Sequence, residues 1–131
     1  MTSLIDTDRV VDWLKPRPDA LELITRLRPD GIAISLVSLG ELYDGIVFAT
    51  DRDAAELALH RFLRLAEVPP LNRSIMRRFA QLRGTLRAQG QLIPDMDLLI
   101  AATALHHGLQ LVRRNRRHFE RVPGLLLYPP S

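Results

Sequence analysis

The 131-residue sequence contains no cysteine and a single lysine, Lys15. Without thiols the chain has neither a disulfide framework nor a thiolate metal site, and we expect a cytoplasmic protein. No stretch approaches the roughly 18 consecutive apolar residues of a membrane-spanning helix, and the N-terminal residues do not resemble a signal peptide. A P-loop, a dinucleotide-binding fingerprint and a Gly-x-Ser-x-Gly elbow are also missing. These absences argue against membrane proteins, nucleotide-cofactor enzymes and serine hydrolases.

Arginine supplies nearly all of the positive charge that the sequence does contain. Its 18 basic residues exceed its 15 acidic ones, which gives a net charge of +3. Guanidinium groups suit phosphate, so an arginine-rich surface is compatible with nucleic acid. A GC-rich genome explains the same composition equally well, and the charge alone decides nothing. The length fits one domain with its own core, and we expect a single domain over residues 1–131.

Short apolar runs alternate with longer helical patterns, which favours β-α units and a mostly parallel sheet. The runs typical of strands are Ser3–Ile5, Ile32–Ser35, Leu109–Val112 and an edge strand at Leu125–Leu127. The helical patterns cover Val10–Leu14, Asp19–Arg28, the segment after Ser38, Asp53–Ala66, Asn72–Leu86 and Pro94–His107. Among their expected ends, Ser38 is an N-cap with Glu41 closing a capping box, Asn72 is a further N-cap, and Gly108 ends the last helix.

Three carboxylates follow the expected strands in a way that brings them to one edge of a parallel sheet. Asp6 stands at the carboxyl end of the first strand, where open α/β sheets bind ligands. Glu41 and Asp97 each lie in the first turn of a helix that faces the same edge. Converging carboxylates repel unless a cation is present, and hard divalent ions prefer oxygen ligands. The pattern predicts a Mg²⁺ or Mn²⁺ site suited to phosphodiester hydrolysis, which Asp8 and Asp95 are close enough in sequence to join.

Each of these residues also has a purely structural explanation. Carboxylates in a first helical turn, such as Asp95 and Asp97, complement the helix dipole. The capping box accounts for Glu41, and Asp6-Thr7-Asp8 is compatible with a simple turn into a helix. His118 is expected to be a loop residue that packs on the core rather than a catalytic base.

Four segments of the chain form a set in fixed order. They are LIDTD at 4–8, SLGELYDG at 38–45, DLLIAATA at 97–104, and NRRHF at 115–119 leading into VPGL at 122–125. Together they resemble the motifs of PIN domains, and in particular of the VapC-type toxins of bacterial toxin–antitoxin pairs. The match runs from Leu4 to Tyr128 at the spacing of the family. It implies a PIN-like α/β fold, in which a central, mostly parallel sheet is flanked by helices in three layers.

The resemblance also implies a function. It predicts a metal-dependent endoribonuclease, the toxin of a type II toxin–antitoxin pair, which cleaves RNA and is blocked by a VapB-like antitoxin. It further implies a homodimer that does not associate with membranes. The residues carried over are Asp6, Glu41 and Asp97 as ligands of Mg²⁺ or Mn²⁺, Asn115 at the fourth site position, and Asp8 and Asp95 as additional candidate ligands.

Arg113 departs from the family, which often has Thr or Ser at this position. A cation there is suited either to clamp a scissile phosphate or to pair with the carboxylates and weaken metal binding. We expect Arg113, Arg114, Arg116 and Arg117 to contact the RNA backbone. A solvated surface turn explains Arg114 and Arg116 equally well.

Two other functions remain open on the sequence alone. Asp6-Thr7-Asp8 has the Asp-x-Asp spacing of haloacid-dehalogenase-like phosphatases, although it continues into Arg9-Val10 rather than Gly-Thr. An inactive PIN-like module that binds RNA or a partner is the second, and the intact carboxylates argue against it. The antitoxin of an active toxin is expected to lay a helix across an apolar groove. Tyr43 is a candidate for lining it, whereas core burial is expected for Leu57 and Phe62.

Overall fold

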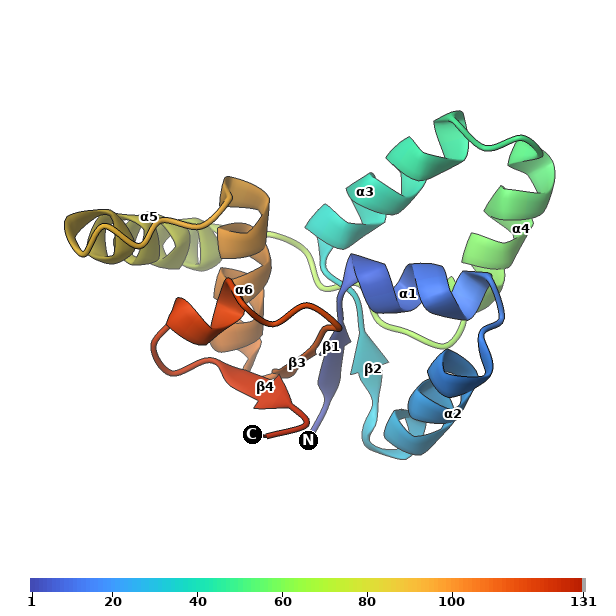
Figure 1. The fold of residues 1–131 in the computed structure, drawn as a ribbon, viewed down its shortest axis with the longest axis horizontal. Coiled ribbons are helices and arrows are strands. Elements are labelled where there is room, and N and C mark those ends of the chain that lie inside the picture. The colour runs from blue at the N-terminus through green and yellow to red at the C-terminus, as the bar shows by residue number, and fades with distance from the viewer. Residues whose placement is uncertain (131) are drawn as a thin grey trace.

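Four short strands form a parallel sheet at the centre of the computed structural model, which describes residues 1–130 (Figure 1). They are β1 (Ser3–Ile5), β2 (Ile32–Ala33), β3 (Gln110–Val112) and β4 (Leu126–Tyr128). Their order is β2-β1-β3-β4, and every pairing between them is parallel. The predicted parallel sheet and the edge position of its last strand are confirmed.

Every segment expected to be helical is helical, with ends that differ by a few residues. The helices are α1 (Thr7–Leu14), α2 (Pro18–Leu27), α3 (Leu36–Val47), α4 (Arg52–Leu63), α5 (Arg73–Ala88) and α6 (Asp95–His107). Asn72 caps α5 by accepting a hydrogen bond from the backbone N–H of Ile75 at 2.9 Å. Gly108 ends α6 at φ +65°, a left-handed conformation that side-chain-bearing residues rarely adopt. No helix within residues 1–130 is long and apolar enough to cross a membrane.

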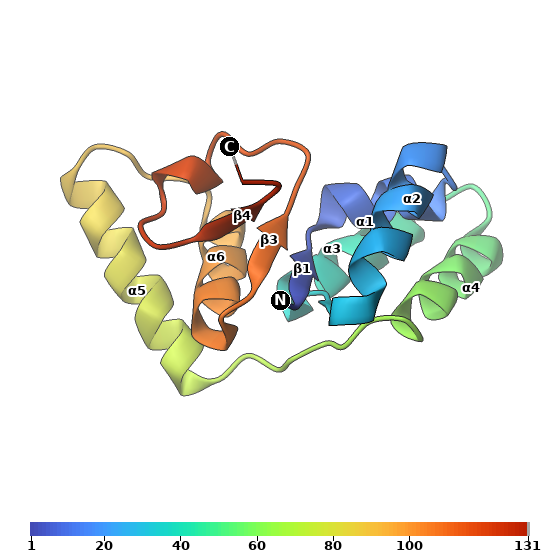
Figure 2. The same cartoon turned by 90° about the horizontal axis from the view of Figure 1, so that it is seen from below.

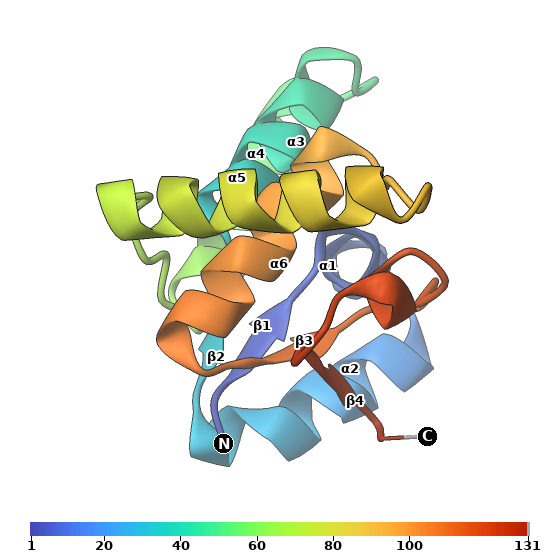
Figure 3. The same cartoon turned by 90° about the vertical axis from the view of Figure 1, so that its left-hand side faces the viewer.

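The helices cover both faces of the sheet because successive side chains of a strand point to opposite sides. In β1, Leu4 packs in one core with residues of α5 and α6 such as Leu86 and Leu98. Ile5 packs in a second core with Ile24 of α2 and Phe62 of α4. Figures 1 and 2 show α5 and α6 on one side of the sheet and α1 to α4 on the other, and Figure 3 shows α5 lying across α6. This confirms the predicted three-layer α/β/α architecture.

The start of α3 differs from the prediction. The N-cap is Ser35, whose hydroxyl accepts a hydrogen bond from the backbone N–H of Ser38 at 2.9 Å. Strand β2 therefore stops at Ala33, two residues before its predicted end, because Ser35 leaves the sheet to cap the helix. Ser38 lies inside the first turn and is buried. The expected capping box between Ser38 and Glu41 is wrong, and both side chains are free for other contacts.

Candidate active site

Asp6 is the most deeply buried carboxylate of the site, with a side chain that is 1% exposed. It directly follows the central strand β1, and its backbone N–H donates to the carbonyl oxygen of Val112 at 3.0 Å. The Ser38 hydroxyl donates to Oδ1 of Asp6 at 3.3 Å. Arg113 pairs with Oδ2. One backbone contact and two side-chain contacts thus fix Asp6 at the carboxyl edge of the sheet.

Burial dominates the electrostatics of Asp6. Loss of solvent raises the pKa of its carboxyl to about 6, and the charges of Asp8 and Glu41 act in the same direction. The guanidinium of Arg113 and the backbone N–H of Thr7 lower the pKa but do not outweigh burial. The positive charge of Arg113 therefore does not fully offset the effect of burial on the ionised Asp6 carboxylate.

Asp97 approaches the same point from the first turn of α6. Its side chain is 13% exposed, and its Oδ1 lies 3.4 Å from Nη1 of Arg113, the nitrogen that also contacts Asp6. Its other oxygen, Oδ2, lies 3.0 Å from Nδ1 of His118. His118 was expected to pack on the core, but its side chain is 40% exposed and faces a site carboxylate, a contact that no spacing in the chain indicates. Two of the predicted carboxylates are thus brought together.

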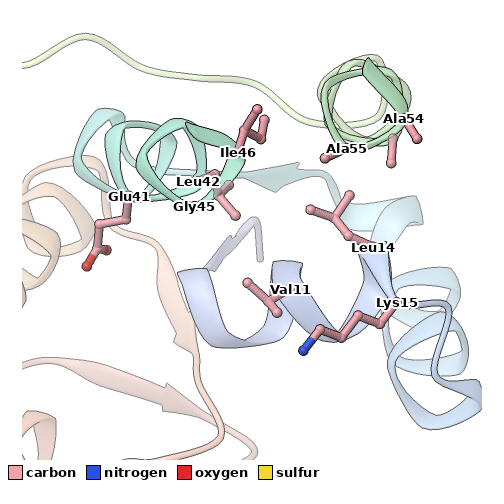
Figure 4. A pocket seen from close by; sticks show the side chains of 10 residues that line it. Val11, Leu14, Lys15, Glu41, Leu42, Gly45, Ile46, Ala54 and Ala55 are labelled. Atoms are coloured by element: carbon pink, nitrogen blue, oxygen red, sulfur yellow. The ribbon is translucent and has the colours of Figure 1, made fainter. Parts of the chain in front are cut away.

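Glu41 faces the same edge from α3 but keeps a separate contact. Its Oε1 accepts a hydrogen bond from the hydroxyl of Thr7, the residue after Asp6, at 2.7 Å. Figure 4 shows Glu41 at the end of an apolar groove, with its carboxylate directed away from the apolar side chains. Glu41 therefore borders the Asp6–Asp97 pair without joining it directly.

Arg113 contacts both the buried carboxylate of Asp6 and the partly buried carboxylate of Asp97. It follows β3, its side chain is 19% exposed, and its guanidinium lies 4.7 Å from the centroid of the Phe119 ring. Its Nε is buried and has no hydrogen-bond partner within the described part of the chain. The guanidinium is thus enclosed by protein, and its charge is directed at Asp6 and Asp97.

The loop after Arg113 is held by α1. Oδ2 of Asp8 accepts the backbone N–H groups of Arg114 and Asn115 at 3.1 and 3.3 Å, and the guanidinium of Arg114 pairs with the buried Asp12 at 3.1 Å. The side-chain oxygen of Asn115 accepts the backbone N–H of Arg117 at 3.3 Å. Asp8 and Asn115 thus shape this loop.

The remaining predicted residues lie outside this cluster. Asp95 is 64% exposed and pairs with Arg83 of α5 at 3.1 Å. Arg116 donates to the backbone oxygen of Pro129, and Arg117 is exposed and makes no ion pair within residues 1–130.

The donor chemistry of the cluster fits a hard divalent cation. Within residues 1–130 no three Asp, Glu or His side chains are gathered closely enough to hold a metal ion in the present arrangement. Asp6 and Asp97 nevertheless direct carboxylate oxygens at one positively charged group, which shows that this point attracts a cation. Oxygen ligands of this kind suit Mg²⁺ and Mn²⁺, and a metal ion held by both carboxylates would have to take the place of the guanidinium.

An apolar groove of about 450 Å³ lies beside Glu41. Besides Glu41, it is lined by Val11 and Leu14 of α1, Lys15 directly after α1, Leu42, Gly45 and Ile46 of α3, and Ala54, Ala55 and Ala58 of α4 (Figure 4). Phe62 is fully buried, as expected, but the core position expected for Leu57 is wrong, since this residue is 51% exposed. It lies on the α4 face that points away from the core, because Leu59 and Phe62 define the buried face.

Similarity to known proteins extends over almost the whole chain. A model of the PIN domain matches residues 3–125. Ribonuclease VapC1 of Methanocaldococcus jannaschii is 33% identical over 127 residues, which cover 95% of this chain and 85% of that protein. Ribonuclease VapC2 of Rickettsia felis is 30% identical over 131 residues, which cover 97% and 96%.

A solved structure has the same fold. In the crystal structure of VapBC2 from Rickettsia felis bound to a DNA fragment from its promoter, one chain superposes with a TM-score of 0.91. It is 28% identical in sequence, and the match covers 97% of both chains. The resemblance drawn from the four motifs thus holds for the architecture as well.

Proposed function

Since the chain belongs to the PIN-domain family, and within it to the VapC ribonucleases, we propose that it is a toxin that cleaves RNA internally with the help of Mg²⁺ or Mn²⁺. The observation that carries the metal site is the convergence of Asp6 and Asp97 on one positive charge at the carboxyl edge of the sheet. The proposed ligands are Asp6, Asp97 and Glu41. When bound, such an ion lowers the pKa of a water molecule and neutralises charge on the scissile phosphate.

Neighbouring side chains orient each proposed ligand. Ser38 donates to Asp6, Thr7 donates to Glu41, and His118 contacts Asp97. Contacts of this kind fix which oxygen atoms face the substrate and limit their freedom to rotate. The site is therefore built in advance by residues of α1, α3 and the loop after β3.

The loop of residues 113–117 is the proposed contact for the RNA backbone. Arg117 is exposed and free of ion pairs within the described residues, whereas Arg114 and Arg116 already hold Asp12 and Pro129. Asn115 is exposed beside them. We expect Arg117 to contribute most to phosphate binding, which gives affinity and salt dependence rather than sequence preference.

A VapB-like antitoxin is the proposed partner, as in the VapBC2 complex of Rickettsia felis. The apolar groove between α1, α3 and α4 ends at Glu41. An antitoxin helix in this groove can therefore cover the site while burying apolar surface. A homodimer and a cytoplasmic location remain predictions from the sequence.

The test is cleavage of total cellular RNA by the purified chain in Mg²⁺, in Mn²⁺ and in EDTA. Discrete fragments that require metal are expected, with a loss on the order of 100-fold or more in Asp6→Asn and Asp97→Asn, since each removes a proposed ligand. Asp95→Asn is the matched control, because it makes the same change two residues from Asp97 at an exposed position. Unchanged cleavage by the Asp6 and Asp97 variants contradicts the assignment. A folded chain without metal-dependent cleavage favours the inactive binding module.

A further inference from the structure

We propose that Arg113 is a resident counter-cation that competes with the divalent ion for Asp6 and Asp97. This inference rests on the proposed metal site and concerns its regulation. One guanidinium nitrogen, Nη1, contacts carboxylate oxygens of both residues. The two residues that would share the ion are thus already joined by a side chain of the same molecule.

The surroundings of Arg113 hold it in this position. Its side chain is mostly covered, and the Phe119 ring lies against its guanidinium at 4.7 Å. The Nε–H is buried without an acceptor, which is costly for a polar group. The side chain occupies this position despite that cost, because the two carboxylates attract it. Arg113 is therefore held within the site and is not a mobile surface arginine.

The competition follows from charge and space. Without a positive charge between them, Asp6 and Asp97 repel each other in a region with little solvent. Arg113 supplies that charge, so the cluster is stable without metal. A divalent ion brings a larger charge to the incompletely compensated Asp6, but it must first displace the guanidinium from both carboxylates. Arg113 consequently weakens metal binding and makes occupancy depend on the concentration of free metal.

The experiment is equilibrium binding of Mn²⁺ to the full chain, followed by the electron paramagnetic resonance signal of free Mn²⁺. Arg113→Gln removes the charge and keeps a polar side chain, and we expect its Kd for Mn²⁺ to be at least tenfold lower than that of the unsubstituted chain. Arg113→Lys retains the positive charge, and its Kd for Mn²⁺ is expected to lie between those of Arg113→Gln and the unsubstituted chain, because an ammonium group does not replace the stacked guanidinium fully. Arg114→Gln is the matched control, because it removes the same charge from the neighbouring residue, which pairs with Asp12 and not with Asp6 or Asp97. Its Kd for Mn²⁺ is expected to change by less than about threefold.

Equal or weaker Mn²⁺ binding by Arg113→Gln overturns the proposal while leaving the metal site itself intact. Absence of Mn²⁺ binding in all four proteins overturns the proposed metal function as well. A second measurement needs no substitution: the Nε–H resonance of Arg113 is followed in nitrogen-15 spectra during addition of Mg²⁺. We expect it to shift as the guanidinium leaves the carboxylates, and an unmoved resonance at saturating Mg²⁺ contradicts displacement.

Discussion

Asp6 combines deep burial with the need to carry charge. Its side chain is 1% exposed, and burial raises the pKa of its carboxyl to about 6 even though Arg113 is adjacent. A residue selected for stability alone has no reason to retain a charge here. The cost is consistent with a group whose ionised form is required by a bound cation or substrate.

The first prediction is a pH dependence of stability in metal-free protein. The pKa of the Asp6 carboxyl rises from 3.8 to about 6 on folding. Below pH 4 both states hold the proton; between pH 4 and 6 the unfolded chain releases it first, so the free energy of unfolding falls as pH rises. Between pH 4 and pH 6 the free energy of unfolding should fall by an amount on the order of 2 to 3 kcal/mol, since each unit of pKa shift corresponds to about 1.4 kcal/mol.

Urea unfolding in EDTA at pH 4, 5, 6 and 7 measures this effect. Asp6→Asn lacks the titrating group, so its stability relative to the unsubstituted chain should increase over this range. Asp95→Asn serves as the exposed control. A difference between Asp6→Asn and the unsubstituted chain that is the same at every pH is the result that contradicts the prediction.

A second prediction concerns His118, which contacts the carboxylate of Asp97 at 3.0 Å. His118→Ala should lower the rate of RNA cleavage by about 10-fold, because loss of a group that orients a metal ligand typically costs 10- to 100-fold. The thermal midpoint should change little, since the side chain is 40% exposed. Cleavage at the unsubstituted rate shows that Asp97 needs no such support.

Sequence reasoning located the acidic residues but not their partners. It was predictable that Asp6, Glu41 and Asp97 face one edge of the sheet, because a strand end or a first helical turn fixes the edge to which a residue belongs. The contacts of His118 and Asp12 were not predictable, because their partners lie 21 and 102 residues away. A local sequence pattern cannot indicate pairs between such distant residues, because they form only when folding of the sheet brings its loops together.

Helix α3 shows how a correct element can begin at the wrong residue. Ser35 and Ser38 are both good N-caps by type, and the sequence does not say where the strand ends. In the structure Ser35 caps the helix, which moves Ser38 one turn inward to reach Asp6. Ser38, which was expected to cap the helix, therefore donates a hydrogen bond to Asp6 in the site instead.

A third prediction separates these two roles. Ser35→Ala should lower the free energy of unfolding by about 1 kcal/mol through loss of the cap, with little effect on metal affinity. Ser38→Ala should instead weaken Mn²⁺ binding, because Asp6 loses a partner that orients it. Chemical unfolding and Mn²⁺ titration of both variants test the distinction. The reverse pattern restores Ser38 as the cap.

At the scale of the whole molecule, the three layers and the parallel sheet with its last strand at the edge were predictable, whereas the strand order was not predicted. Short, continuously apolar runs indicate strands covered on both faces, and their alternation with helical patterns favours a parallel sheet between two layers of helices. Leu57 was wrongly expected in the core, because its residue type does not reveal whether an apolar side chain faces the core or the outside.

A fourth prediction tests the apolar groove as the antitoxin surface. Ala54→Arg places a charge among the groove-lining residues and should raise the Kd for the antitoxin by at least tenfold, or about 1.4 kcal/mol. Cleavage of RNA by the free toxin should persist. Glu56→Arg introduces the same residue at an exposed position outside the groove and is the control. Titration calorimetry gives both constants; equal affinities for the two variants place the antitoxin elsewhere.

The order of strands in the sheet has a consequence for synthesis of the protein. β1 pairs with β3, and Asp6 meets Arg113, which lies 107 positions later in the chain. Contacts this distant in sequence form late in folding. Until residues 110–113 have been translated, the central strand lacks one neighbour and Asp6 lacks its counter-charge. This edge of the sheet therefore cannot be completed before residues 110–113 are present, because both β3 and Arg113 come from that segment.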